Sequence, residues 1–349
     1  MSIEYVSGDI AQSDAGIIVN TVNCVGVMGK GVALAVKNAF PEIFPRYAEA
    51  CKAGKLHPGG IMMLGTRDGR IVANLASKKH WRDPSQRQWA GGSLFFLNYW
   101  LDKKDIAPCR IAMPLPGAGL GGIDPQISHD MVRSWMAPAL ARGFSLDIYA
   151  PAMDFALGPI AYAGVGARET PADVLAVMRD FGGLAAAEGW LLRSGGARGA
   201  DTAFHDGAKA LKVKSEIFLP EEKSWGGDYR FATTDVHYRI MRALHPTPEK
   251  LTGIALELMA RNGCQVYGQD FTNPSRVVVC WTEGGKDKGG TAQAIRLAGA
   301  AGIPILNLGR PDLKGITASA AFALARDMVV ERESLLQRTG FPTSNPVPC

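Results

Sequence analysis

Short apolar runs alternate with amphipathic stretches along the chain, and most of these segments end near glycine or proline. In the first 150 residues the pattern predicts strands at 3–6, 16–22, 110–114 and 145–149. It predicts helices at 31–40, 93–103 and 125–140. Asp68-Gly69, a strong turn signal, links two further strands at 61–66 and 70–75 into a hairpin. Together these elements make one complete α/β domain.

The pattern breaks at 151–159, a short stretch with proline and glycine, and a second series then begins. This series predicts strands at 160–164, 190–193, 216–219, 276–281 and 303–308. It predicts helices at 171–188, 201–211, 251–262 and 293–300, and a polar, irregular stretch at 220–235. Strands that alternate with helices indicate a parallel sheet with right-handed crossovers.

We therefore expect two α/β domains, at 1–152 and 158–340, followed by a flexible tail at 341–349. A chain of 349 residues exceeds the size at which a single hydrophobic core usually keeps growing. Hydrophobic residues make up 47% and charged residues 20%, which is typical of a globular protein and not of a disordered one. No run of about 18 apolar residues and no secretory signal is visible, which predicts a cytoplasmic protein without a membrane partner.

Cysteine and histidine spacing excludes the common metal motifs. The six cysteines include no CxxC pair, and the six histidines include no HExxH motif. We therefore expect reduced thiols, no metal and no cofactor. The net charge is +5, and residues 1–150 hold 16 basic and 12 acidic side chains, so most of the excess lies in the first domain. Such a surplus is compatible with an anionic ligand or nucleic acid but proves neither.

Three segments of the first domain follow predicted strands or begin a helix: Gly8–Ile10, Asn20–Gly31 and Pro116–Gly122. Ligands of open α/β sheets bind at such strand ends. Small residues let backbone N–H groups approach a diphosphate, and a helix N-terminus adds positive potential. Any one glycine loop is equally well explained as a turn. Two glycine loops together with Asn20 and Asn23 favour a phosphate-binding cleft.

These residues also resemble a known family. The stretch VNTVNCVGVMGKGVALAVKNAFP is similar to the signature of macrodomains, in particular their DarG-like branch, which also resembles the human terminal ADP-ribose protein glycohydrolase. MPLPGAGLGGID is similar to the second phosphate loop of that family. Ser77–Arg82 is similar to the lysine-containing motif of the DarG-like enzymes. The resemblance covers roughly residues 1–150 and predicts a macrodomain there. A second resemblance, described below, implies that the parallel-sheet domain that follows is Rossmann-like.

The resemblance implies an ADP-ribose cleft with defined roles. Asp9 would hold the adenine amino group, Asn20 and Asn23 would face the distal ribose, and Lys78 would act at the anomeric carbon. A lysine with a lowered pKa can attack such a carbon as a neutral amine, and repulsion from Lys79 would lower that pKa. From the residues alone, a solvated surface pair of lysines is the better interpretation. The full set of ligand-binding residues implied by the resemblance is Asp9, Ile10, Asn20, Asn23, Met28, Gly29, Lys30, Gly31, Val32, Pro116, Gly117, Ala118, Gly119, Leu120 and Gly121.

One departure concerns the second glycine loop. The human enzyme carries an acidic partner there, and the matching residue in this chain is Gly121. The DarG-like branch shares this glycine, so the departure leaves hydrolysis by the lysine alone as the expected chemistry. Asp124 lies too far along the loop to be assigned as a substitute.

The second domain carries three more glycine-containing loops with hydroxyl and arginine side chains suited to phosphate. The candidate residues are Gly164, Gly166, Arg168, Ser194, Gly195, Gly196, Arg198, Asp201, Gly289, Gly290 and Thr291. SGGARGADTAFHDGA resembles the DprA branch of the SLOG superfamily over roughly 158–310, which implies binding of a nucleotide or of single-stranded DNA. Related phosphoribohydrolases have a glutamate after their GGxGT loop, whereas Ala292-Gln293-Ala294 follows here. Binding without cleavage is therefore favoured in this domain.

Two functions remain open from the sequence. One is a glycohydrolase that removes ADP-ribose, for instance from DNA bases. The other is a non-catalytic sensor or sponge for an ADP-ribose-derived signalling nucleotide. The expected partners are ADP-ribose or a derivative, and ADP-ribosylated or single-stranded DNA, and homo-oligomerisation stays open. Trp81, Trp89, Trp225 and Trp281 could stack on bases, although buried packing is the commoner use of tryptophan.

Overall fold

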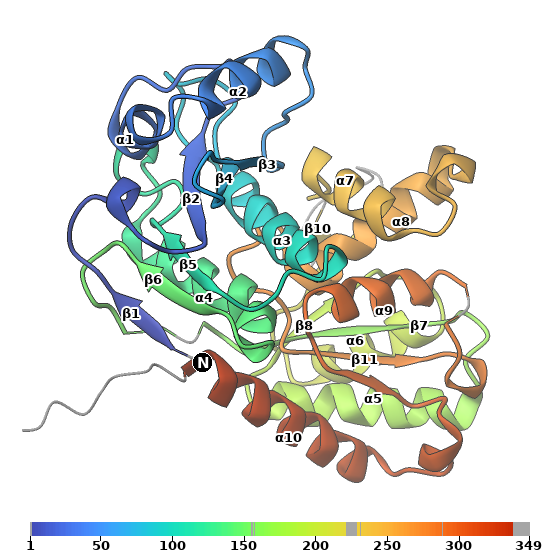
Figure 1. Cartoon of the computed structure of the whole chain (residues 1–349). Coiled ribbons are helices and arrows are strands. Elements are labelled where there is room, and N and C mark those ends of the chain that lie inside the picture. Colours follow the sequence, from blue (N-terminus) through green and yellow to red (C-terminus); the bar gives the residue numbers. More distant parts are fainter. Residues whose placement is uncertain are drawn as a thin grey trace, which may run out of the picture. The chain divides into compact units, whose positions relative to one another are not determined.

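The computed structural model describes residues 2–154, 156, 158–220, 229–230, 232–287 and 289–337. The chain divides into two compact units, Met1–Ala156 with Leu335–Cys349, and Leu157–Ser334. Each unit contains its own six-stranded sheet with helices on both faces, as Figure 1 shows, so the predicted α/β class is confirmed. The predicted tail at 341–349 lies outside the described residues.

The sheet of the first unit is mostly parallel. Its strand order is β1 (Ile3–Tyr5), β6 (Ser145–Ile148), β5 (Arg110–Met113), β2 (Ile17–Val22), β4 (Ile71–Ala76) and β3 (Ile61–Gly65). Among these described strands only β3 runs antiparallel to its neighbour, and it forms with β4 the predicted hairpin, whose turn residue Gly69 has φ of 87°. The carboxyl ends of β2, β4 and β5 therefore meet at one edge of the sheet.

Alternate residues of these strands face opposite sides of the sheet, so both sides present apolar side chains. A pair of helices covers each side. On one face, α1 (Gly31–Ala39) and α2 (Ile43–Lys52) bury residues such as Val36 and Tyr47. On the other, α3 (Arg87–Lys103) and α4 (Pro125–Ala141) pack together (Figure 1). The rings of Phe95 and Trp135 lie 5.9 Å apart. Two short 3-10 turns, η1 (Ile10–Gln12) and η2 (Gly119–Gly121), follow β1 and β5.

The second unit has a fully parallel sheet. Its order is β10 (Tyr229–Arg230), β9 (Glu216–Phe218), β8 (Leu191–Ser194), β7 (Ala161–Gly166), β11 (Val277–Trp281) and β12 (Ile305–Asn307). The chain starts in the centre at β7, builds outward to β9, and then returns to the other side of β7 with β11. This is the order of a doubly wound Rossmann-like sheet, whose ligand crevice lies where the order reverses.

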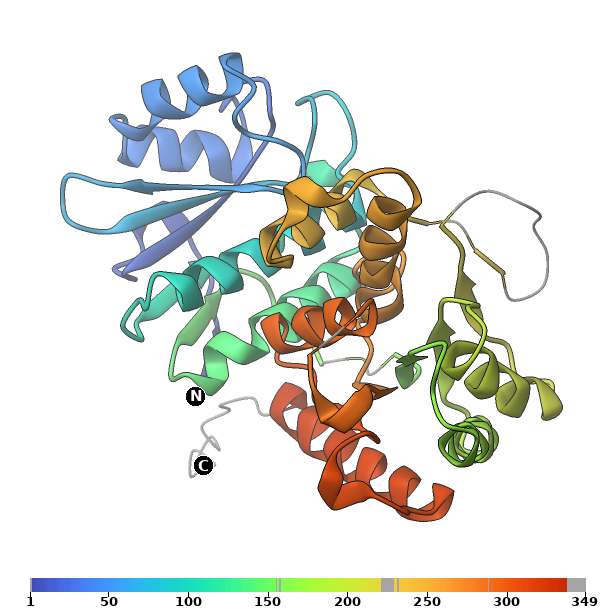
Figure 2. The same ribbon diagram turned by 90° about the vertical axis from the view of Figure 1, so that its right-hand side faces the viewer.

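Helices cover both faces of this second sheet, as Figures 1 and 2 show. One apolar core joins the strands to α5 (Ala172–Ala187), α6 (Ala200–Ala210) and α10 (Ala318–Gln337). The other face carries α8 (Gly253–Tyr267) and α9 (Thr291–Ala300), and α7 (Asp235–Leu244) packs on both of these helices. Short 3-10 turns are η3 (Pro248–Lys250), η4 (Glu283–Gly285) and η5 (Pro311–Leu313).

Several predicted elements need correction. The helix predicted at 93–103 begins at Arg87, and the sequence pattern missed α2, α7 and α10. The α2 helix contains Pro45 in its first turn, where proline is tolerated because the N–H group has no helical partner there. Of the stretch predicted as irregular at 220–235, residues 221–228 and 231 lie outside the described residues, and α7 begins at Asp235.

Candidate functional site

The predicted lysine loop leaves the sheet at the end of β4. Ser77 and Lys78 follow its last residue, and the backbone N–H of Cys24, in the loop after β2, donates to the carbonyl of Lys79 (3.1 Å). The Nζ of Lys78 donates to the carbonyl of Leu120, in the loop after β5 (2.7 Å). Loops from three neighbouring strands thus meet at Lys78, because parallel strands deliver their carboxyl ends to one edge.

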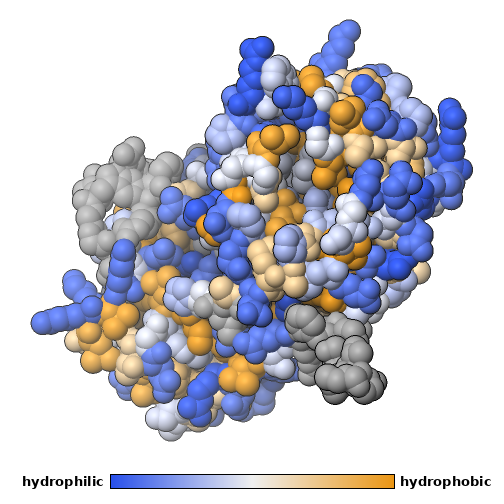
Figure 3. Space-filling view, turned by 90° about the vertical axis from the view of Figure 1, so that its left-hand side faces the viewer, coloured by the Kyte–Doolittle hydropathy of each residue, from blue (hydrophilic) through white to orange (hydrophobic). Residues whose placement is uncertain are grey.

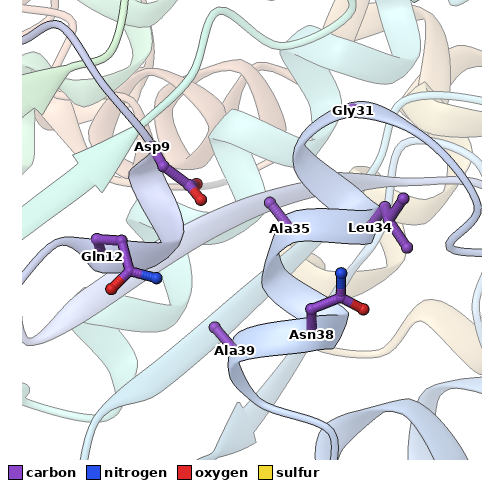
Figure 4. Close-up of a pocket in the computed structure, with 7 residues that line it drawn as sticks. All are labelled: Asp9, Gln12, Gly31, Leu34, Ala35, Asn38 and Ala39. Carbon is purple, nitrogen blue, oxygen red and sulfur yellow. The ribbon is translucent and has the colours of Figure 1, made fainter.

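A pocket of about 440 Å³ lies between η1 and α1. Its lining residues, shown in Figure 4, are Asp9, Gln12, Gly31, Leu34, Ala35, Asn38 and Ala39. The carboxylate of Asp9 caps η1 by accepting from the backbone N–H of Ala11 (2.9 Å), and the residue is exposed. Asp9 therefore keeps acceptor capacity toward the pocket, since a carboxylate has two oxygens.

The two predicted asparagines contact protein groups. Asn20 is fully buried in β2, and its Nδ2 donates to the Oδ1 of Asn74, the register partner in β4 (2.8 Å). Asn23 is 6% exposed, and its amide bridges its own loop by donating to the carbonyl of Val27 (2.6 Å) and accepting from the N–H of Val25 (3.0 Å). In the structure the Asn20 amide joins β2 to β4, and the Asn23 amide holds the loop after β2. Their role toward the ribose stays a prediction.

The other predicted residues of this first site divide between the core and the surface loops. Ile10 and Met28 are buried side chains of the core, 3% and 2% exposed. The exposed residues include Gly29, Lys30 and Gly31 at the N-terminus of α1, whereas Val32 is partly buried. In the second loop, Pro116 and Gly117 are buried, Ala118 precedes η2, and Gly119 has φ of 60°.

Ser85 is a site residue that the sequence did not reveal. Its backbone N–H donates to the carbonyl of Gly121 (2.8 Å), and its hydroxyl lies 3.4 Å from that of Ser77. A Cβ atom at Gly121 would lie 2.6 Å from the Ser85 Oγ and 3.8 Å from Lys78 Cε. The space that a side chain at Gly121 would need is therefore filled by Ser85. No local signal marks Ser85, because its contact partner lies 36 residues further along the chain.

The second unit contains a pocket of about 380 Å³ at the carboxyl end of β7, where the strand order reverses. It brings together six of the predicted residues: Gly166, Arg168, Asp201, Gly289, Gly290 and Thr291. Gly164 and Ser194 instead serve packing, because the Ser194 hydroxyl donates to the carbonyl of Gly164 (2.6 Å) in the buried sheet. Gly195 lies under the pocket, while Gly196 and Arg198 are exposed beside it. Lys288, which precedes Gly289 in the third glycine loop, lies outside the described residues.

Helix α8 supplies polar pocket residues that the sequence analysis missed. Arg261, Asn262 and Gln265 are all nine-tenths or more buried and line the pocket. With its amide oriented to suit its neighbours, Gln265 accepts from the Gly195 N–H (2.7 Å) and from Arg261 Nη1 (3.0 Å). Arg261 Nη1 also lies 4.0 Å from the Asp201 carboxylate. Polar residues within an otherwise apolar helix were the available signal for this site.

The charges under this pocket are strongly affected by burial. Burial raises the pKa of Asp201 above its usual range, while Arg261 and nearby backbone N–H groups oppose that shift. Burial also lowers the pKa of Arg261. Among the described residues, the Arg261 Nε has no hydrogen-bond partner. A buried cation with an unpaired N–H suits an anionic or polar ligand.

The comparisons with known proteins concern the first unit. Residues 19–132 match the family model "Macro domain". The chain is 42% identical over 125 residues to a DNA ADP-ribosyl glycohydrolase of Mycobacterium tuberculosis, and 37% identical over 124 residues to one of Thermus aquaticus. The first unit is a macrodomain. The matched segments span about a third of this chain and about a third of each relative.

Solved structures give further neighbours of the macrodomain. One is the macrodomain of Mycobacterium tuberculosis DarG, 37% identical, with a TM-score of 0.40, covering 43% of this chain and 98% of that one. Another is Thermosipho africanus DarTG in complex with ADP-ribose, 26% identical, with a TM-score of 0.39, covering 43% of this chain and 42% of that one. The macro family model ends at residue 132, so the SLOG resemblance of the second unit stays a prediction.

Partial burial lowers the pKa of Lys78 in the macrodomain, and the carboxylate of Asp83 opposes this shift. The physical cause is therefore desolvation of the ammonium, where the sequence had suggested repulsion from Lys79. Asp124 is the N-cap of α4 and accepts from the N–H groups of Gln126 (2.9 Å) and Ile127 (3.2 Å). One carboxylate oxygen of Asp124, Oδ1, is thus engaged as a helix cap.

Two features are absent from the described part of the chain. It contains no group of three or more His, Cys, Asp or Glu side chains arranged to hold a metal ion. None of its helices is both long and apolar enough to span a membrane.

Proposed function

We propose that the macrodomain binds ADP-ribose and hydrolyses its linkage to DNA, with Lys78 as the catalytic residue. The relatives that support this proposal carry the name DNA ADP-ribosyl glycohydrolase. The observation that carries it is the amine of Lys78, which has a pKa lowered by burial and lies 2.7 Å from the carbonyl of Leu120. An amine that loses its proton more easily is a better nucleophile near neutral pH.

The chemistry follows from a neutral lysine. The Nζ of Lys78 would attack the anomeric carbon of the distal ribose, and the bond from that carbon to the base nitrogen would break. The base leaves with the electron pair and takes up a proton. Water then attacks the same carbon, which releases ADP-ribose and restores the lysine amine. No acidic partner is needed at Gly121.

Binding of the remaining ligand would use groups on the same edge of the sheet. The glycine loops ending at Gly31 and Gly121 offer backbone N–H groups to the diphosphate, and α1 adds the positive potential of its N-terminus. The pocket beside Asp9 suits the adenosine end, because a free carboxylate oxygen can accept from the adenine amino group.

The test compares Lys78→Ala with Lys79→Ala, a neighbouring lysine of the same charge. Both variants and the unchanged protein are incubated with an ADP-ribosylated single-stranded oligonucleotide, and released ADP-ribose is measured by mass spectrometry. We expect Lys78→Ala to lose release while its calorimetric affinity for ADP-ribose stays within about threefold. An active Lys78→Ala variant would show that the lysine is assigned wrongly. ADP-ribose binding without any release by the unchanged protein would favour the sensor or sponge.

We propose as a second function that the second unit binds a phosphorylated nucleotide without cleaving it. The pocket at β7 supports this, because about 380 Å³ suits a small ligand and α9 begins at its edge with Thr291. The buried guanidinium of Arg261 adds positive charge beneath the same pocket.

The salt dependence of binding separates this ligand from single-stranded DNA. A strand held through several phosphates loses affinity with a log–log slope of about −0.7 per phosphate, whereas a mononucleotide gives a shallower slope. We expect a shallow slope and strong loss of binding in Gly195→Ala, because a Cβ atom there would meet Arg261 Nη1 at 1.4 Å. Gly183→Ala, whose Cβ atom would lie 3.8 Å from the nearest atom, is the matched control. Release of a free base from a nucleotide would contradict the non-cleaving role.

A further inference from the structure

An aromatic and cationic stack lies on the loop that follows Lys78. The rings of His80 and Trp81 are stacked with centroids 5.4 Å apart and an interplanar angle of 28°. The guanidinium of Arg82 lies over the Trp81 ring, 4.6 Å from its centroid. Three consecutive side chains thus form one layered group, which we call the Trp81 platform.

The platform is held by backbone contacts on both sides. The carbonyl of Lys79 accepts from Cys24 (3.1 Å), and the carbonyl of His80 accepts from the N–H of Asp83 (3.2 Å). The Nδ1 of His80 accepts from the N–H of Arg82 (3.2 Å), which fixes the orientation of the imidazole ring. A fixed ring loses less conformational freedom when a ligand stacks on it.

Trp81 is 47% exposed, so it does not serve the buried packing that is usual for tryptophan. Among the described residues of the first unit, the exposed large hydrophobic side chains all lie on the site loops or on α1: Val25, Val27, Leu34, Trp81 and Leu120. Figure 3 shows one face of the molecule, on which hydrophobic residues reach the surface in separate patches among hydrophilic ones. Exposed apolar side chains on the loops that meet at Lys78 suit a ligand with apolar faces.

We propose that the Trp81 platform stacks on an unpaired nucleobase that neighbours the ADP-ribosylated base in single-stranded DNA. This inference rests on the proposed function, because it assumes that the modified strand enters at Lys78. A base offers a flat face to Trp81, and stacking of this kind tolerates every base. Lys79 and Arg82 are exposed on the same loop and supply the positive charge that a phosphate backbone requires, against the single acidic side chain of Asp83.

The choice of DNA follows from the combination of groups. The Trp81 indole stays 47% exposed beside the His80 ring and the Arg82 guanidinium, so the uncovered part of its ring can take a further planar group. The stack begins two residues after Lys78, so a base next to the modified one is the group within reach of it. The proposed hydrolysis needs such a strand, whereas free ADP-ribose needs no group at this position.

The test measures binding in the Lys78→Ala background, so that the result does not depend on turnover. The probe is a fluorescein-labelled single-stranded oligonucleotide with one ADP-ribosylated base, and free ADP-ribose is titrated separately. We expect Trp81→Ala to weaken oligonucleotide binding roughly 5- to 150-fold, the range for loss of one stacked base, and to leave ADP-ribose affinity unchanged. Trp81→Phe, which keeps a flat ring, is expected to restore most of the affinity.

Each other outcome overturns the proposal. If the Trp81→Ala variant binds the oligonucleotide as tightly as the protein that retains Trp81, no base stacks on Trp81. The same conclusion follows if the protein that retains Trp81 does not bind the oligonucleotide. A matching loss of ADP-ribose affinity would assign Trp81 to the ADP-ribose cleft. If Trp81→Ala loses as much affinity for an ADP-ribosylated peptide as for the oligonucleotide, the platform would instead contact a protein partner. Failure of the proposed function has a separate sign, namely no ADP-ribose release by the protein with Lys78 present, whatever Trp81 does to binding.

Discussion

The side chain of Ser85 occupies the space that a side chain at Gly121 would need, since a Cβ atom there would lie 2.6 Å from its Oγ and 3.1 Å from its Cβ. The backbone of the two residues is also joined by the 2.8 Å bond from the Ser85 N–H to the Gly121 carbonyl. The lysine loop and the second glycine loop are therefore fitted to one another at this point.

We accordingly expect Gly121→Ala to destabilise the macrodomain by about 1–3 kcal/mol, the usual effect of overpacking, and to weaken ADP-ribose binding. Ser85→Gly removes both clashing atoms, so the double variant should recover most of the loss. Urea unfolding and calorimetry measure the two effects. Additive effects of the two substitutions would show that these residues do not interact as the geometry indicates.

The rate of ADP-ribose release should rise with pH, because only the neutral amine of Lys78 attacks. The rise should level off below pH 10.5, since burial lowers the pKa of this lysine from that value. Asp83→Asn removes the carboxylate that opposes the shift, so the midpoint of the profile should move to lower pH. Glu49→Gln, an exposed acid on α2, should leave the midpoint in place. A midpoint that moves upward in Asp83→Asn contradicts the assigned role of Asp83.

The second unit should lose stability in mild acid through His237. Burial lowers the pKa of this histidine from 6.5 to about 4, and its Nδ1 accepts from the N–H of Thr234 (3.1 Å) at the start of α7. The unfolded chain takes up the proton first, so stability is full above pH 6.5 and falls as the pH drops toward 4. The expected loss is on the order of 3 kcal/mol.

Urea unfolding at pH 7 and at pH 5 measures this effect, of which about 2 kcal/mol is reached at pH 5. His237→Gln should reduce the difference between the two pH values, although it also lowers stability at pH 7 because the buried ring is lost. His57→Gln, an exposed histidine of the other unit, is the control. A pH dependence that survives unchanged in His237→Gln would assign the acid sensitivity to other groups.

Arg261→Met should destabilise the second unit by about 3 kcal/mol, because it leaves the Asp201 carboxylate buried without its cation. Adding Asp201→Asn removes the unpaired charge and should recover part of the loss. Chemical denaturation of the two variants provides the comparison. If Arg261→Met unfolds at the same denaturant concentration as the unchanged protein, the buried pair has no structural role.

The sequence by itself determined the features whose cause is local. Asp68-Gly69 predicted the hairpin of β3 and β4, because a positive φ at the turn needs glycine. The regular exchange of strands and helices predicted two α/β units, and the glycine-rich segments marked the loops at the strand ends. The macrodomain signature predicted the first unit, and the match over residues 19–132 confirms it.

The tertiary structure alone decided which distant residues share a site. Ser85 meets Gly121, and Arg261 of α8 meets Gly195, only because parallel strands and their helices bring separate loops to one edge. The pKa of Lys78 likewise depends on how much water the neighbouring loops exclude from its amine. Hydrophobic periodicity shows which face of a helix or strand is apolar, but not which other element packs against that face. That packing decides how deeply a side chain is buried and which distant residues it contacts, and burial in turn shifts its pKa.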